Sequence, residues 1–286
     1  MGVALLVPYI AGFWNIGGQG QYIFGAIFAT WLGLRLSGVP AEVAVPLIFV
    51  FGFFGGALWA LPPTLMKMSL GVSEVITTVM MNFIAVFFLN YVVIGPMEGE
   101  QAKAFHSPAS DPVPKAFQLP SFYGTTLTWG LVVALAVAVV AFFVLKYARY
   151  GYELRIIGAN QEVARYAGIQ IKKDVLVAMI ISGGLAGVAG LVEVYGTTTV
   201  LLPQVFSDIT TSFGYIGIPV ALIAYLNPIV TIFSSIFLSG ILIGSYSLEQ
   251  TYGIPIDVVT AIYGLIMLFA MIGVYGSFGK FWRRKK

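Results

Sequence analysis

The side chains of this sequence that could carry chemistry are carboxamides and one carboxylate, set in apolar surroundings. Asn15, Gln19 and Gln21 lie in a glycine-rich break between two apolar stretches. Asn82 lies inside a later apolar run, and Glu193 lies in the last turn of another. Amides both donate and accept hydrogen bonds, and an ionisable group inside a membrane segment is a functional candidate. These five residues are therefore the predicted lining of a pathway for a small polar solute.

Each of these assignments has a structural alternative that the sequence leaves open. Glycine-rich backbone at membrane depth occurs where it is buried in protein or lines a wet cavity, but this break could also be a simple loop between two helices. Asn82, like Asn90, could instead form a hydrogen bond between helices. Glu193 could lie at the outer water interface.

Several kinds of chemistry are excluded. The chain has no cysteine, one histidine and no G-x-x-x-x-G-K-[ST] phosphate loop. It should therefore hold no metal and hydrolyse no ATP itself. No carboxylate pair falls in the middle of an apolar run, which argues against proton coupling, and no run carries repeated arginines, which argues against a voltage sensor.

The composition indicates a polytopic membrane protein. Of the 286 residues, 59% are hydrophobic and 9% are charged, against roughly 25% charged in ordinary soluble domains. We expect one all-α transmembrane domain over residues 1–286, a helical bundle with about eight spanning helices plus broken or re-entrant segments. Pro62-Pro63 is expected to end the second apolar run. The expected segments are 2–13, 22–36, 43–61, 73–95, 125–145, 175–195, 213–225, 229–246 and 256–275.

Charge distribution predicts the orientation. Residues 146–174 hold six basic and three acidic side chains, and the tail from Lys280 holds five more basic ones. With Lys67, these regions fall on one side of the alternating spans and carry twelve of the fifteen basic residues. The positive-inside rule makes that side cytoplasmic, including the C-terminus, and makes residues 96–124 an external loop. The net charge of +3 is thus an orientation signal and does not indicate nucleic acid.

Two local patterns predict contacts. Asn160 is a good N-cap for a short helix over residues 161–167, and Gly168 is a natural stop, so residues 146–174 are predicted to dock on a partner. In the next apolar run, small residues recur on one helix face, where they allow another helix to approach closely. These helix-packing residues are Gly183, Gly187 and Gly190.

Four motifs, in order along most of the chain, resemble those of ABC importer permeases of the branched-chain amino acid, ribose and nucleoside group. They are N-I-G-G-Q-G-Q at 15–21, S-E-V-I-T-T-V-M-M-N at 73–82 with G-P at 95–96, G-A-N-Q-E-V-A-R-Y-A-G-I at 158–169 and G-Y-I-G-I-P-V-A-L at 214–222. The second motif is most similar to nucleoside-type members. Three residues depart from these family motifs: Gln19 stands where the family usually has glutamate, and Arg165 and Pro219 each stand where alanine is usual. Family members have further helix ahead of the first motif, so the completeness of the N-terminus is open.

The resemblance implies a permease subunit, not an enzyme, in the plasma or inner membrane. Its expected partners are membrane lipid, a second permease in a homo- or heterodimer, cytoplasmic ATP-binding subunits and an external solute-binding protein or lipoprotein. It implies no cofactor in this chain, with ATP and Mg on the partner ATPase. The implied coupling helix, seated on that ATPase, comprises Gly158, Ala159, Asn160, Glu162, Ala164, Arg165 and Gly168.

The expected mechanism is alternating access driven by ATP in separate subunits. Nucleosides are the first expected substrate class, simple sugars such as ribose the second, and branched-chain amino acids the third. An ion-gradient-driven secondary transporter is the alternative from a different class. It would take up solute without ATP and would favour buried carboxylates, which are scarce in this sequence.

Overall fold

The computed structural model confirms that the chain is all-α. It describes residues 1–105, 108–122, 125, 127–207 and 213–252, with residues 258, 261, 262, 264–266, 268, 269, 272 and 273. Over these residues twelve α-helices follow one another, and the β-structure is limited to an isolated bridge between Ser121 and Thr128. The predicted span at 256–275 and the basic tail lie largely or wholly outside the described residues.

Three helices that pack closely on one another form the centre of the bundle. They are α2 (Gly18–Arg35), α3 (Ala41–Leu70) and α9 (Ile171–Glu193). Glycines occupy the positions at which these helices meet, and a Cβ added at Gly25 or Gly56 would overlap the backbone of α9. Without water to drive helices together, close van der Waals packing of this kind stabilises membrane bundles.

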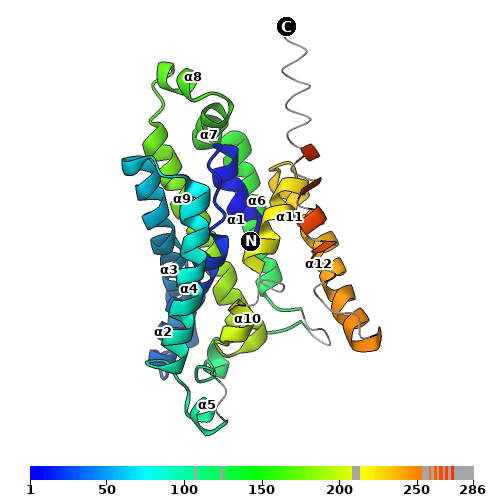
Figure 1. Ribbon diagram of the computed structural model, residues 1–286. Helices are drawn as coiled ribbons and strands as arrows, with labels where there is room; N and C mark the ends of the chain where they lie inside the picture. The colour runs from blue at the N-terminus through cyan, green and yellow to red at the C-terminus, as the bar shows by residue number, and fades with distance from the viewer. Residues whose placement is uncertain are drawn as a thin grey trace.

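Among the described residues, five helices are long and apolar enough to cross a membrane. They are α3, α4 (Glu74–Ile94), α6 (Gly130–Tyr147), α9 with its π-helical extension η2 (Val194–Thr198), and α12 (Pro228–Tyr252). In their most apolar windows only 17% of α6 and 25% of α12 is buried, against 56% of α9. The low burial of α6 and α12 indicates that they lie at the periphery of the bundle, as Figure 1 shows for α12.

The predicted number of about eight spans is only partly confirmed. Two predicted segments form helices too short to cross a hydrocarbon core of about 30 Å: α1 (Gly2–Ile10) has 9 residues and α11 (Phe213–Ile223) has 11. Gly214, at the start of α11, donates a backbone hydrogen bond to Gln19, at the start of α2. Helices α1, α2 and α11 therefore meet inside the bundle. This agrees with the prediction that the bundle contains broken or re-entrant segments in addition to its spans.

The prediction that Pro62-Pro63 ends a helix is wrong. Helix α3 continues through both prolines to Leu70 and ends at Gly71, which has φ +69°. Each proline removes one N–H donor from the helix. Inside a membrane, however, an unwound backbone would lose many more hydrogen bonds, so the helix persists. Lys67, expected in a loop, lies in the last turn of α3 and forms an ion pair with Glu74 at 2.8 Å.

The two ends of the bundle carry different short elements (Figure 1). At one end α5 (Glu100–Phe105) and η1 (Lys115–Phe117) lie within the predicted loop 96–124, which is therefore not wholly irregular. Backbone hydrogen bonds such as Val113 N to Thr199 O, 2.8 Å, tie this segment to the region before α10 (Pro203–Ser207). At the other end, α7 (Arg149–Ala159) and α8 (Gln161–Tyr166) extend beyond the spans.

Candidate functional site

A buried polar network centres on Asn15, in the irregular segment between α1 and α2. The Asn15 amide nitrogen donates to Gln21 Oε1 and to Ser182 Oγ of α9, each at 3.0 Å. Its oxygen accepts from the Gly17 N–H and from Gln21 Nε2, at 3.0 and 3.1 Å. Tyr9 donates its hydroxyl to the Asn15 carbonyl. The network thus fixes an irregular backbone against α1, α2 and α9.

Asn82 of α4 holds the other side of the same irregular segment. Its oxygen accepts from the Gly20 N–H at 2.8 Å and its nitrogen donates to the Ile16 carbonyl at 2.9 Å. Gly20 lies in the first turn of α2, where the N–H groups have no partner within the helix, and Ile16 lies in the irregular segment just before it. One side chain therefore satisfies a donor and an acceptor that lipid could not.

Gln19 joins α2 to the second broken region. Its Nε2 donates to the Phe206 carbonyl of α10 at 2.6 Å, and its Oε1 accepts from the Gly214 N–H of α11 at 3.0 Å. Gln19 replaces the glutamate usual in the resembling motif. A carboxylate accepts only, so the donation to Phe206 depends on the amide. We call the residues Asn15, Gln19, Gln21, Asn82 and Ser182 the polar joint.

The structure gives the four predicted pathway amides hydrogen-bond partners within the protein. Asn15, Gln19, Gln21 and Asn82 are buried, and none lines either of the two cavities described below. A role in translocation therefore stays a prediction, and in this conformation the amides act as structural joints. For them to face a solute, the helices that meet at the polar joint would have to move apart.

We expect Asn82→Ala to lower the free energy of unfolding by roughly 2–4 kcal/mol, because a buried N–H group and a partly buried carbonyl lose their partners. Asn90→Ala is the matched control on the same helix. Asn90 donates only to the Val86 carbonyl, which already lies within α4, so its replacement should cost less than about 1 kcal/mol. Thermal unfolding of the two purified variants tests this, and equal losses would contradict the structural role of Asn82.

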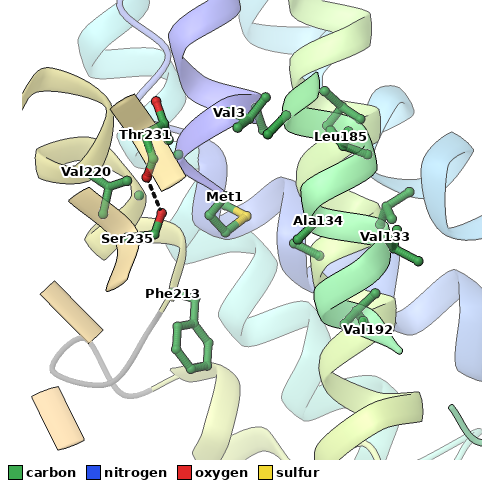
Figure 2. Close-up of a pocket in the computed structure, with 18 of the residues that line it drawn as sticks. Met1, Val3, Val133, Ala134, Leu185, Val192, Phe213, Val220, Thr231 and Ser235 are labelled. Carbon is green, nitrogen blue, oxygen red and sulfur yellow. Dashed lines mark hydrogen bonds between the residues drawn. The ribbon is translucent and has the colours of Figure 1, made fainter. Parts of the chain in front are cut away.

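Glu193, the fifth predicted pathway residue, is half-buried at the end of α9 and lines a cavity of about 540 Å³. Figure 2 shows this cavity between α1, α6, α9, α11 and α12. Its lining is mostly aliphatic, and we call it the apolar cavity. The hydroxyls of Thr231 and Ser235 face it but donate to the carbonyls of Asn227 and Thr231, one turn earlier in the chain.

The segment predicted to dock is more helical than the sequence indicated. Helix α7 occupies much of it, with Gly151, Leu154 and Ile157 buried against the bundle. An added Cβ at Gly158 would overlap the Ile10 carbonyl oxygen, so α7 contacts the end of α1 directly. Tyr150, also on α7, donates its hydroxyl to the Asp174 carbonyl at 3.0 Å, and burial raises its pKa.

Helix α8 has the predicted cap and stop. The Asn160 side chain accepts from the Glu162 and Val163 N–H groups, at 2.8 and 3.2 Å, and Gly168 has φ +74°. Ala159, Glu162 and Arg165 are exposed. Ala164, predicted to contact the partner, is instead fully buried against the bundle. The large hydrophobic side chains exposed on α8 are Val163, 54% exposed, and Tyr166, 93% exposed.

The three helix-packing glycines lie where α9 meets its neighbours. An added Cβ at Gly183 would overlap Gly56 of α3, and one at Gly187 would overlap the Gly52 carbonyl of α3. One at Gly190 would overlap the Tyr22 carbonyl of α2. No group of three or more His, Cys, Asp or Glu side chains that could hold a metal ion is found in the part of the chain that the structure describes.

Comparison with known proteins assigns the chain to a family. The profile of the family described as "Branched-chain amino acid transport system / permease component" matches residues 1–271. The chain belongs to this family of ABC transporter permeases. As such it is a transmembrane, non-catalytic subunit, and the resemblance seen in its four motifs is confirmed.

The permease is similar to curated proteins from bacteria and an archaeon. It is 33% identical to the guanosine ABC transporter permease protein NupP of Bacillus subtilis, with 94% of this chain and 76% of the relative covered. It is 30% identical to the glucose ABC transporter permease protein TsgB13 of Haloferax volcanii, covering 94% and 71%. For the nucleoside ABC transporter permease protein NupB of Lactococcus lactis the identity is 28%, covering 94% and 75%. No solved structure matches the permease.

Two parts of the permease's candidate site were missed from the sequence. Ser182 was not singled out, yet its hydroxyl accepts from Asn15 across 167 residues of chain. Thr78 was not singled out, and its hydroxyl accepts from the Ile16 N–H at 3.3 Å. The sequence did hold a signal for both residues, because each hydroxyl lies on a helix face that also carries small or polar residues.

Proposed function

We propose that this permease is the membrane subunit of an ATP-driven importer of nucleosides. It pairs with a second permease, with two cytoplasmic ATPase subunits that carry ATP and Mg²⁺, and with an external solute-binding protein. ATPase closure displaces α7 and α8, and the paired permeases then change the side of the membrane to which their pathway opens.

The observation that carries this proposal is the geometry of α8. The helix is short, capped by Asn160 and anchored to the bundle by the buried Ala164. Its outward face carries Val163 and Tyr166, which are apolar or aromatic and largely exposed. Exposed aromatic side chains at a defined position are typical anchors of protein interfaces. A rigid helix with such a face can transmit the movement of a docked partner to α7 and α9.

The proposed orientation follows from charge. The chain reverses between α3 and α4 near Lys67 and again through α7 and α8, so both reversals lie at the same end of the bundle. That end carries most of the basic residues of the chain between Met1 and Pro228. An excess of Lys and Arg in short loops marks the cytoplasmic side, which supports a cytoplasmic position for α7 and α8.

The proposed substrate class rests on the relatives and on one motif. NupP and NupB are named for guanosine and nucleosides, while TsgB13 is named for glucose. The segment from Ser73 to Asn82 resembles nucleoside-type members. Nucleosides are uncharged and rich in hydrogen-bonding groups, so a pathway lined by amides and hydroxyls, with few charges, suits them.

We expect guanosine uptake by the reconstituted complex to require ATP and to be competed by other nucleosides. The measurement is uptake of labelled guanosine into proteoliposomes that contain the permease, its ATPase subunits and its binding protein. Excess glucose and excess leucine are the matched competitors and should leave uptake unchanged. Uptake that needs an ion gradient and no ATP would contradict the proposal of an ATP-driven importer. Competition by glucose alone would contradict only the proposal that nucleosides are the substrate class.

A further inference from the structure

A second cavity, of about 770 Å³, lies at the end of the bundle where α6 meets α7. Two basic side chains line it, Lys146 at the end of α6 and Arg155 on α7. Rings of Tyr9, Trp14 and Tyr225 lie around them. Among the described residues that line this basic cavity, none is acidic. It is therefore a concave site with two positive charges and an aromatic rim.

Neither positive charge is neutralised by a nearby carboxylate in the part of the chain that is described. Glu153, which lies on the same helix as Arg155, is paired with Arg149 at 2.7 Å. Lys146 lies over the rings of Phe142 and Tyr147, with its Nζ at 5.0 and 5.3 Å from their centroids. One Arg155 N–H group donates to the Leu145 carbonyl. Since arginine has five N–H donors, this bond fixes the guanidinium and leaves donors for a ligand.

The apolar cavity of Figure 2 follows the basic cavity along the same helices. Both are lined by α1, α6, α11 and the start of α12. On α6 the basic cavity ends at Phe142 and the apolar cavity begins at Ala138, one helical turn away. On α12 the corresponding residues are Pro228 and Thr231. The two cavities are thus successive parts of one seam between helices.

The seam is long and mostly apolar. Along α6 its lining runs from Lys146 to Gly130, which is roughly 24 Å at about 1.5 Å per residue and exceeds the roughly 15 Å of one leaflet in a hydrocarbon core of about 30 Å. The hydroxyls of Thr231 and Ser235 already donate to backbone carbonyls, so they need no hydrogen bond from a ligand. Among the described lining residues, the one carboxylate is Glu193, at the end of α9 away from α7.

We propose that this seam binds an anionic glycerophospholipid. Its phosphate lies in the basic cavity between Lys146 and Arg155, and an acyl chain runs along α6 and α12 into the apolar cavity. Basic pockets between transmembrane helices suit lipid phosphates, whereas a free phosphate would make no use of the apolar cavity. The proposal requires only that the chain spans a membrane, so it does not depend on the proposed substrate or orientation.

The turn between α11 and α12 completes the headgroup site. Tyr225 and Leu226 have φ of +49° and +57°, which is an unfavourable backbone conformation for residues with side chains. Both residues line the basic cavity, together with Asn227. Such strain is found where the surrounding structure imposes it, often at ligand sites. Here it holds the exposed Tyr225 and the amide of Asn227 at the mouth of the site.

The test is lipid binding to the full chain, purified in neutral detergent with the subunits that copurify and measured by native mass spectrometry. Phosphatidylglycerol is titrated against phosphatidylcholine, and glycerol 3-phosphate is the free-phosphate arm. Each basic group is expected to contribute about fivefold to the affinity for phosphatidylglycerol. Lys146→Gln should therefore weaken binding of this lipid about fivefold. The double variant Lys146→Gln with Arg155→Gln should weaken it about 25-fold. Ala134→Phe, which fills the apolar cavity without changing charge, should also release the lipid.

The matched control is the pair Lys172→Gln with Lys173→Gln. It removes two exposed charges near the same end of the bundle but outside both cavities. This control should retain the preference for phosphatidylglycerol. Equal binding of the two lipids by the unchanged protein would overturn the proposal, as would an equal loss in the control pair. Competition by glycerol 3-phosphate as strong as that by phosphatidylglycerol would overturn it in favour of a free-phosphate site. Because the readout is binding and not uptake, it is independent of the proposed transport function.

Discussion

Replacing Gly187 with leucine is expected to abolish the folded chain. A Cβ at this position would overlap the Gly52 carbonyl oxygen and lie 3.0 Å from the Gly56 Cα. Both are backbone atoms of α3, so no side-chain rotation can relieve the overlap. Gly25 of α2 packs on Gly187 from the other side. Overpacking a core with methylene groups costs about 1–3 kcal/mol, and a clash with the backbone of α3 should exceed that range.

The measurement is the yield and thermal stability of a fluorescent fusion by size-exclusion chromatography. Gly240→Leu is the matched control, because Gly240 lies in an exposed turn of α12 with no atom within 4 Å of an added Cβ. Leucine favours a helix over glycine by up to about 1 kcal/mol, so this control should be neutral or stabilising. If Gly187→Leu folded as well as Gly240→Leu, the close packing of α2, α3 and α9 would be wrong.

The contrast between these glycines shows what the sequence could predict about packing. The spacing of Gly183, Gly187 and Gly190 indicated one close-packed face on α9. It could not identify the partner helices, because the same four-residue spacing occurs at Gly52 and Gly56 of α3 and also at Gly240 and Gly244 of α12, where an added Cβ would meet no atom within 4 Å. Apolar length likewise predicted the long spans but misplaced the end of α3, since two prolines end a helix in water more readily than in lipid.

The polar joint shows where sequence reasoning about the site reached its limit. Amides in apolar segments were correctly singled out as unusual, but residue type alone does not separate a pathway lining from a structural joint. The distinction depends on partners far away in the chain, such as Ser182 for Asn15 and Gly214 for Gln19. Local signals did better: the cap at Asn160 and the stop at Gly168 were predicted correctly, because both depend on neighbouring residues only.

Replacing Tyr166 with alanine is expected to uncouple ATP hydrolysis from uptake without unfolding the permease. The side chain is 93% exposed on α8, so its removal should leave stability unchanged. If α8 docks on an ATPase subunit, loss of a central aromatic anchor should weaken that contact by about 2 kcal/mol or more, roughly 30-fold. Ala164 is unsuitable for this test, because it is buried and its enlargement would displace α8 itself.

The measurement compares guanosine uptake, ATPase stimulation and copurification of the ATPase subunits for the Tyr166→Ala complex. Tyr91→Ala is the matched control, since Tyr91 is 68% exposed but lies near the other end of α4, away from α8. We expect the control to keep both uptake and copurification. Full uptake by Tyr166→Ala would count against α8 as the docking helix. An equal loss in both variants would mean that the effect of Tyr166→Ala does not arise at α8, because two exposed tyrosines at opposite ends cannot contact the same ATPase surface.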